Sequence, residues 1–196
     1  MTISEIQKLY RKCHTPAHVQ QHMKVVAEVA VLIAQKIKKN GHMIDVSRVR
    51  QLSLLHDLMK AIVFTNIKPS SFTKQPTKAD LEFWKKMREV YKRHDVEATS
   101  SVLKKHKQTW FSRAVLSQQF DAITSKKHPL VSLEERVVYY ADKRVAHSTI
   151  VSLKERLDEG YKRYSGKKPK SKSVKNIELA IHMLEEEIFS MTGEKI

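Results

Sequence analysis

Apolar residues recur at steps of three and four along most of this chain of 196 residues, and this spacing restricts the fold more than any other feature. In segment 15–40 they fall on one face of a helix, at Val19, Met23, Val26, Ala30, Ile33 and Ile37. Only four glycines and five prolines interrupt the sequence, and no strand pattern of useful length is found. The sequence therefore predicts an all-α fold.

Helix start and stop signals divide this pattern into seven or eight helices. Capping residues precede several apolar runs, as in Thr2-x-x-Glu5 and Ser132-x-x-Glu135. We expect helices over about 2–13, 15–40, 45–63, 77–107 with a break near His94, 111–123, 132–164 with a bend, and a final one that includes 177–188.

The composition limits the surroundings and the partners of the protein. The net charge is +16, which favours polyanions such as nucleic acid or nucleotides, although lysines on solvated helix faces explain it equally well. The single cysteine, Cys13, excludes an internal disulfide and a cysteine-based zinc site. With no signal peptide and no long apolar stretch, we expect a cytoplasmic protein without a membrane partner; the oligomeric state stays open.

Several polar residues lie where the pattern predicts the interior. His22 shares the apolar face of segment 15–40, and the pair His56-Asp57 lies within the most apolar helix. Asp142 faces inward between Val138 and Val145. Taken singly, each residue is a core histidine, a cap or half of a salt bridge; together they predict a divalent cation, and mixed imidazole and carboxylate ligands suit Mn²⁺, Fe²⁺, Zn²⁺ or Co²⁺.

Three segments resemble motifs of the HD superfamily of metal-dependent phosphohydrolases, over about residues 15–156. They are Thr15-Pro-Ala-His-Val-Gln-Gln-His22, Leu54-Leu-His-Asp-Leu-Met-Lys60 and Tyr139-Tyr-Ala-Asp-Lys-Arg144. The resemblance implies a single HD-domain helical bundle with His22, His56, Asp57 and Asp142 as metal ligands. We expect the HD phosphohydrolase domain to span 1–165, and 166–196 to form a basic loop and a C-terminal helix packed on or beside it.

Two further histidines bear on the number of ions. His94 and His128 resemble the middle histidines of the two-metal HD branch, in which Asp57 would bridge to a second ion. One ion and two ions both remain open, since His128 also reads as a loop histidine before Pro129. Met59 stands where many members have glycine, and it could narrow the pocket for the substrate.

The resemblance implies hydrolysis of a nucleotide or a related phosphate ester, as a phosphomonoesterase or phosphodiesterase, by a metal-activated water. Asp57 would belong to the catalytic centre. Lys60 would hold a phosphoryl oxygen, or else pair with Asp57. Lys143 and Arg144 would bind substrate phosphate, or else lie solvated on the outer face. If His94 is not a ligand, it could protonate the leaving group.

Two rival functions remain. One is a basic, helical nucleic-acid-binding protein or nuclease, because segment 162–175 is rich in lysine and a second basic patch at 104–113 contains Trp110 and Phe111. The other is a catalytically silent scaffold that holds a metal.

Overall fold

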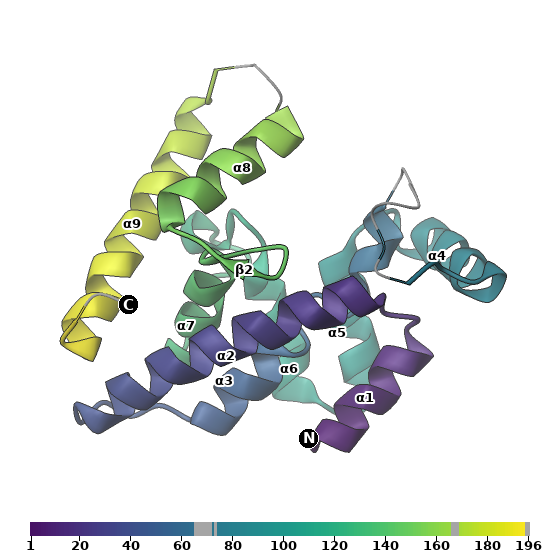
Figure 1. Ribbon diagram of the computed structural model, residues 1–196, viewed down its shortest axis with the longest axis horizontal. Helices are drawn as coiled ribbons and strands as arrows, with labels where there is room; N and C mark the ends of the chain where they lie inside the picture. The colour runs from purple at the N-terminus through teal and green to yellow at the C-terminus, as the bar shows by residue number, and fades with distance from the viewer. Residues whose placement is uncertain (65–71, 73, 166–168, 195–196) are drawn as a thin grey trace.

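The computed structural model describes residues 1–64, 72, 74–165 and 169–194, and helices make up most of this part of the chain (Figure 1). The all-α fold is confirmed, with one two-stranded hairpin added. The elements are α1 (Ile3–Lys12), α2 (Ala17–Lys39), α3 (Val46–Ser53), η1 (Lys60–Val63), α4 (Lys78–Tyr91), α5 (Asp95–Lys105), α6 (Thr109–Ala114), η3 (Val115–Gln118), η4 (Ala122–Thr124), α7 (Leu133–Asp142), β1 (Val145–Ala146), β2 (Thr149–Ile150), α8 (Leu153–Ser165) and α9 (Lys172–Thr192).

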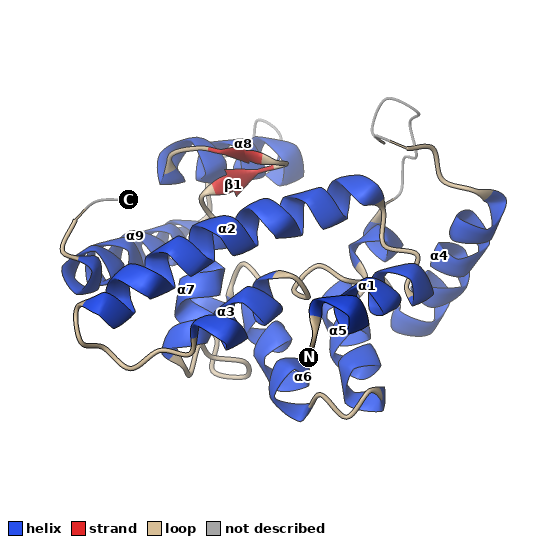
Figure 2. Ribbon diagram, turned by 60° about the horizontal axis from the view of Figure 1, so that its bottom comes forward, coloured by secondary structure: helices blue, strands red, loops and turns tan. Residues whose placement is uncertain are grey.

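Helix α2 is the centre of the bundle. It packs against α3, α7 and α9, and most of its apolar residues, including Met23, Val26 and Ile33, are fully buried. Figure 2 shows α3 on one side of α2 and the hairpin with α8 on the other. One apolar core runs through α1, α2, α3, α5, α6, α7 and α9, so helices from both ends of the chain share it.

Several of the predicted start signals act as caps, although α2 begins after Pro16 without a side-chain cap. Thr2 caps α1 in a reciprocal capping box with Glu5, and Thr77 caps α4 in the same way with Asp80. The side chain of Ser132 accepts a hydrogen bond from the third residue of α7. These bonds satisfy backbone N–H groups that have no partner in the first helical turn, which is why the starts could be predicted locally.

The predicted helix over 45–63 ends early, at Ser53. Residues 54–59 form consecutive turns with hydrogen bonds to the third preceding residue, such as Leu58 N to Leu55 O at 3.1 Å, and the short helix η1 follows. Side chains of α1 and of the connection between α1 and α2 bind the carbonyls that the break releases. Tyr10 Oη donates to Leu54 O at 2.5 Å, and Thr15 Oγ1 donates to Leu58 O at 2.8 Å.

We expect Thr15→Val to lower the free energy of unfolding by about 1–3 kcal/mol, because the Leu58 carbonyl would be buried without its hydroxyl donor. Urea denaturation followed by circular dichroism measures this change. Thr149→Val is a matched control, since Thr149 is exposed on β2 and should change stability little. Equal stability of Thr15→Val and the wild type would show that the turn does not depend on this bond.

The predicted bent helix over 132–164 is instead two helices separated by a hairpin. Helix α7 ends at Asp142, β1 and β2 pair in an antiparallel hairpin, and α8 begins at Leu153. His147, at the tip of the hairpin, has φ of +56°. Ser152 and Glu155 cap α8 by reciprocal hydrogen bonds, and this local start signal explains why the helix begins anew.

The final helix, α9, lies along the bundle and contacts α2, α7 and η4. Its end is tied to the end of α2, where Asn40 Nδ2 donates to Met191 O at 3.0 Å and Lys36 pairs with Glu194 at 2.6 Å. Among the helices of the described ranges, none combines the length and the apolar character needed to cross a membrane.

Candidate metal centre

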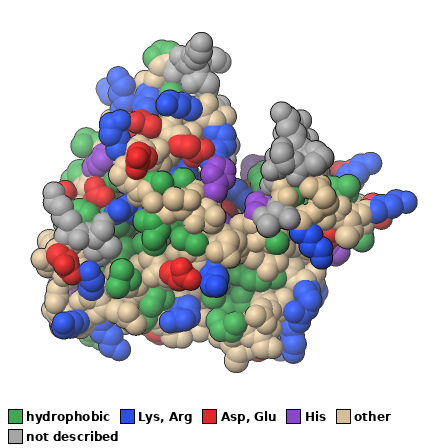
Figure 3. Space-filling view, in the orientation of Figure 1, with side chains coloured by type: hydrophobic (Ala, Val, Ile, Leu, Met, Phe, Trp, Pro, Cys, Tyr) green, Lys and Arg blue, Asp and Glu red, His purple; other side chains and the backbone are tan. Residues whose placement is uncertain are grey.

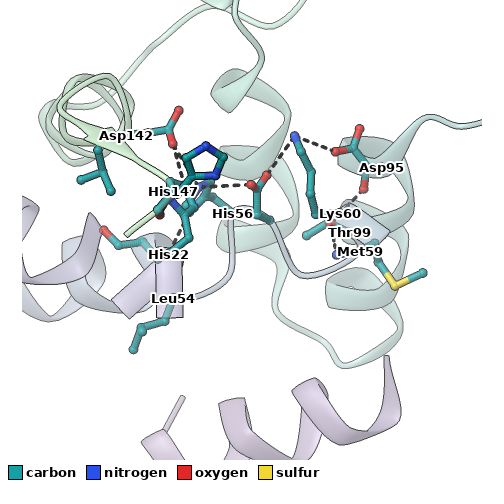
Figure 4. A network of polar contacts seen from close by, with 12 residues as sticks. His22, Leu54, His56, Met59, Lys60, Asp95, Thr99, Asp142 and His147 are labelled. Atoms are coloured by element: carbon teal, nitrogen blue, oxygen red, sulfur yellow. Dashed lines mark hydrogen bonds and ion pairs between the residues drawn. The ribbon is translucent and has the colours of Figure 1, made fainter. Parts of the chain in front are cut away.

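Three segments bring two imidazoles and a carboxylate together beside α2. His22 lies on α2, His56 on the turns after α3, and Asp142 is the last residue of α7. Their candidate ligand atoms all lie within 4.8 Å of one another. His22 Nε2 is 3.0 Å and His56 Nε2 is 3.6 Å from the same oxygen, Asp142 Oδ1 (Figure 4).

Backbone carbonyls orient both imidazole rings. His22 Nδ1 is 2.6 Å from His147 O, and His56 Nδ1 is 2.8 Å from Ser53 O. Because a carbonyl accepts only, each Nδ1 must carry a proton, and in its neutral form each ring presents its lone pair at Nε2. This arrangement is the one that metal-binding histidines adopt, with the second ring nitrogen donating to a fixed acceptor.

The donor set fits a cation. His56 is 4% exposed, and its Nε2 has no hydrogen-bond partner within the described residues. That lone pair and the lone pair of His22 Nε2 both face a carboxylate oxygen, so the cluster presents acceptors only unless a proton or an ion lies between them. A divalent ion would satisfy all three groups, which makes these residues suitable to hold one.

The other carboxylate, Asp57, lies next to this cluster. Its Oδ2 is 3.8 Å from His56 Nε2, and its Oδ1 is 3.5 Å from Lys60 Nζ. The same ammonium is 3.2 Å from Asp95 Oδ2 on α5, so Lys60 bridges two carboxylates (Figure 4).

The charges in the site and its burial shift the pKa values of its carboxylates in different directions. Burial would raise the pKa of Asp142, but the Lys143 ammonium and the two histidines outweigh burial and hold that pKa well below its usual value. Burial likewise opposes ionisation of Asp57, and Lys60 and His56 together lower its pKa. At Asp95 burial prevails over Lys60, and the pKa is raised. Both carboxylates nearest the imidazoles are therefore ionised and available to a cation.

The two neighbouring basic residues, Lys143 and Arg144, lie in different surroundings. Lys143 is 6% exposed; its Nζ is 2.7 Å from Asp142 Oδ2 and 4.3 Å from the centre of the Tyr139 ring. Arg144 instead donates to Val151 O and to the Tyr140 hydroxyl. Lys143 lines the cavity described below, whereas Arg144 does not.

The structure does not bring His94 or His128 to the cluster. His94 precedes the first residue of α5, is exposed, and lies 3.9 Å from Glu97 through Nδ1. His128 is half-buried in the loop before α7, where its backbone N–H donates to Ser125 Oγ. Neither side chain lines the cavity at the metal centre.

A cavity of about 1010 Å³ opens over the cluster, with His22, His56, Asp57 and Asp142 in its lining. Figure 3 shows the molecule hollowed between the part that contains α8 and the part that contains α4, with histidine side chains at the hollow. One wall is aromatic: the His18 ring lies 5.7 Å from that of Phe64 and 4.9 Å from that of Phe72. The cavity is large enough for a small organic phosphate.

Sequence reasoning missed several of the groups that build the site. Asp95 directly follows His94 and is the first residue of α5. An acidic residue at this position is ordinarily explained by its favourable interaction with the helix dipole. His147 contributes a backbone carbonyl, which no sequence pattern identifies. Arg156 also lines the cavity, and only the position of α8 in the fold indicates a role for it at the site.

The two basic patches also have defined contacts. Phe111 is buried in the core, and the Arg48 guanidinium lies 5.3 Å from the centre of the Trp110 ring. In segment 162–175, Lys170 pairs with Glu178 at 2.6 Å and with Asp158 at 3.4 Å. Phe111 is thus not available to stack on a base.

Comparison with known proteins adds one match. A sequence model described as the HD domain matches residues 19–146, more than half of the chain, and this span contains all four candidate ligands. No curated protein and no solved structure matches the chain significantly.

Proposed function

Because the chain belongs to the HD domain family, whose members are generally metal-dependent phosphohydrolases, we propose that it hydrolyses a phosphate ester at the centre formed by His22, His56, Asp57 and Asp142. The observation that carries the proposal is the cluster of two Nε2 lone pairs and a carboxylate within 4.8 Å, with both Nδ1 protons directed to carbonyls.

A divalent transition metal held by His22, His56 and Asp142, with Asp57 beside them, would activate a water and withdraw charge from the phosphoryl group. Mn²⁺, Fe²⁺, Zn²⁺ and Co²⁺ all suit this donor set. One ion accounts for the cluster; a second ion would need His94 and His128 to approach it.

Two lysines are suited to the phosphoryl group of the substrate. Lys60 lies in the cavity lining, where Asp57 and Asp95 hold its ammonium in place. Lys143 lies in the same lining against Asp142 and can stabilise negative charge near the centre. Asp95, whose pKa is raised, is a better placed proton donor for the leaving group than the exposed His94.

A nucleotide is the substrate class that we propose, in line with the aromatic wall of the cavity. His18, Phe64 and Phe72 offer ring faces and edges on which a base could stack, while the phosphate lies at the metal centre. This places both the substrate and the catalytic residues in one cavity.

The test is elemental analysis of the purified protein together with a screen of phosphate esters. We expect about one or two equivalents of transition metal in the wild type and hydrolysis of at least one nucleotide. Asp57→Ala should lose hydrolysis while its helical circular dichroism stays unchanged.

Full activity in Asp57→Ala would contradict the mechanism. Absence of metal from the wild type, even after reconstitution with Mn²⁺, Fe²⁺, Zn²⁺ and Co²⁺, would contradict the metal centre. A metal-loaded protein without hydrolytic activity would favour the silent scaffold. Binding of RNA or DNA with a steep salt dependence would favour the nucleic-acid-binding function.

A further inference from the structure

One face of α8 forms a basic wall of the cavity. Arg156, Gly160 and Arg163 all belong to the cavity lining. Their spacing of four and three residues places them on the same face of the helix. The metal centre and this face therefore open into one space, although they come from different parts of the chain.

This wall carries a net positive charge. Glu159 is the carboxylate that both arginines share: Arg163 Nε donates to it at 2.9 Å, and Arg156 Nη1 lies 3.4 Å from it. Partial burial opposes ionisation of Glu159, but the two arginines outweigh it and lower its pKa. Two guanidinium groups thus face one ionised carboxylate, which leaves one positive charge in excess. The cavity's other acid nearby, Glu178, is neutralised by Lys170.

The hairpin links this wall to the metal centre. Arg156 Nε donates to Val145 O at 2.9 Å, and two residues further along the chain His147 O accepts from His22 Nδ1. The α-carbons of Val145 and His147 can be no more than about 7 Å apart. The Arg156 guanidinium and the candidate metal ligand His22 are therefore both bonded to the backbone of the hairpin, at residues two apart, and both line the same cavity.

Gly160 lies directly beside the Arg156 guanidinium. A Cβ at this position would lie 3.1 Å from Arg156 Nη1. Glycine inside a helix costs roughly 0.5–1 kcal/mol relative to alanine. The absence of a side chain here lets the Arg156 guanidinium lie against the helix at the cavity wall, where a larger residue would displace it.

We propose that Arg156, Gly160 and Arg163 form a second anion subsite, which binds a phosphate beyond the one held at the metal centre. The substrate class would then be a compound with a chain of two or more phosphates. Arginine suits such a group, since its planar donors match phosphate oxygens. The inference rests on the proposed function in one respect, namely that the metal centre holds the phosphate that is hydrolysed. Anion binding at the subsite itself can be measured without hydrolysis.

The test is calorimetric titration of the full-length, metal-reconstituted protein with tripolyphosphate and with orthophosphate, at fixed ionic strength. We expect tripolyphosphate to bind at least about tenfold more tightly than orthophosphate in the wild type. Arg163→Gln should weaken tripolyphosphate binding about tenfold and leave orthophosphate binding unchanged. Gly160→Leu should also weaken tripolyphosphate binding selectively, because it fills the space without removing a charge.

Lys162→Gln is the matched control, since it removes one positive charge from the same helix at an exposed position outside the cavity lining. An equal loss of tripolyphosphate binding in Lys162→Gln and Arg163→Gln would overturn the subsite in favour of general charge attraction. Equal binding of the two anions by the wild type would also overturn it. Circular dichroism checks the fold of each variant. Arg163 is the residue changed because Arg156→Gln would also break the hydrogen bond to the hairpin backbone, whereas Arg163 bonds to Glu159.

The subsite and the proposed function fail in different ways. If the protein hydrolyses monophosphate esters but binds tripolyphosphate no more tightly than orthophosphate, the subsite is contradicted and the proposed hydrolase function stands. If the protein binds tripolyphosphate tightly through Arg163 but has no hydrolytic activity, the subsite is supported and the proposed hydrolase function is contradicted.

Discussion

Asp142→Asn is expected to abolish metal retention and to lower hydrolysis by more than about 100-fold, because loss of a group that only orients a metal ligand already costs about 10–100-fold. Asp142 Oδ1 is the atom that faces both imidazoles, at 3.0 Å from His22 and 3.6 Å from His56. The amide keeps the shape of the side chain but removes its charge. Elemental analysis and a hydrolysis assay measure the two losses.

Asp121→Asn is the control for this change, because Asp121 is exposed and lies outside the cavity lining. Circular dichroism and urea denaturation of Asp142→Asn are needed as well. Lys143 would lose the partner that lies 2.7 Å from its buried ammonium, and some stability should be lost with it. If Asp142→Asn retained its metal and its activity, the ion would have to be held elsewhere.

Arg113→Ala is expected to lower the free energy of unfolding by about 1.5–3 kcal/mol, the range for hydrogen bonds to charged groups, because Glu135 is buried while the guanidinium is half-exposed and partly screened by water. Glu135 is fully buried on α7, and Arg113 Nη2 donates to its Oε1 at 2.7 Å. Without the guanidinium, the donors left to that carboxylate among the described residues are neutral: the Val131 N–H at 2.8 Å and the Ser117 hydroxyl at 3.4 Å. Urea denaturation measures the loss.

The double variant Arg113→Ala/Glu135→Gln separates the charge from the packing. It should recover part of the lost stability, because the neutral amide costs less to bury than an unpaired carboxylate. Lys126→Ala serves as the surface control, since Lys126 is exposed in the loop before α7. A loss below about 0.5 kcal/mol for Arg113→Ala, the range of ordinary surface changes, would show that the pair does not hold α6 to α7.

The metal centre and the α8 wall have different structural supports. The imidazoles are held by the carbonyls of Ser53, the last residue of α3, and of the hairpin tip, whereas Arg156 is held by β1. The hairpin is common to both, and its two-residue tip requires the positive φ of His147. Changes in the hairpin should therefore affect metal binding and anion binding together, while Arg163→Gln should affect anion binding alone.

Helix starts, apolar faces and the inward positions of His22, His56 and Asp142 follow from the sequence by itself. Capping side chains bond to N–H groups within three residues, and the spacing of apolar residues fixes which face of a helix is buried. Both are local properties, so they can be predicted before the fold is known. The match of the motifs to the HD family rests on the same residues, in the same order.

Only the tertiary structure decided how those helices break and what surrounds the site. The chain leaves the helix after Ser53 because Tyr10 and Thr15, more than 40 residues earlier, bind the released carbonyls. Lys143 and Arg144 are neighbours in sequence, yet one is buried against Asp142 and the other is bound to the hairpin and α7. These outcomes depend on groups brought together by packing over long sequence separations, which no local pattern of capping or periodicity encodes.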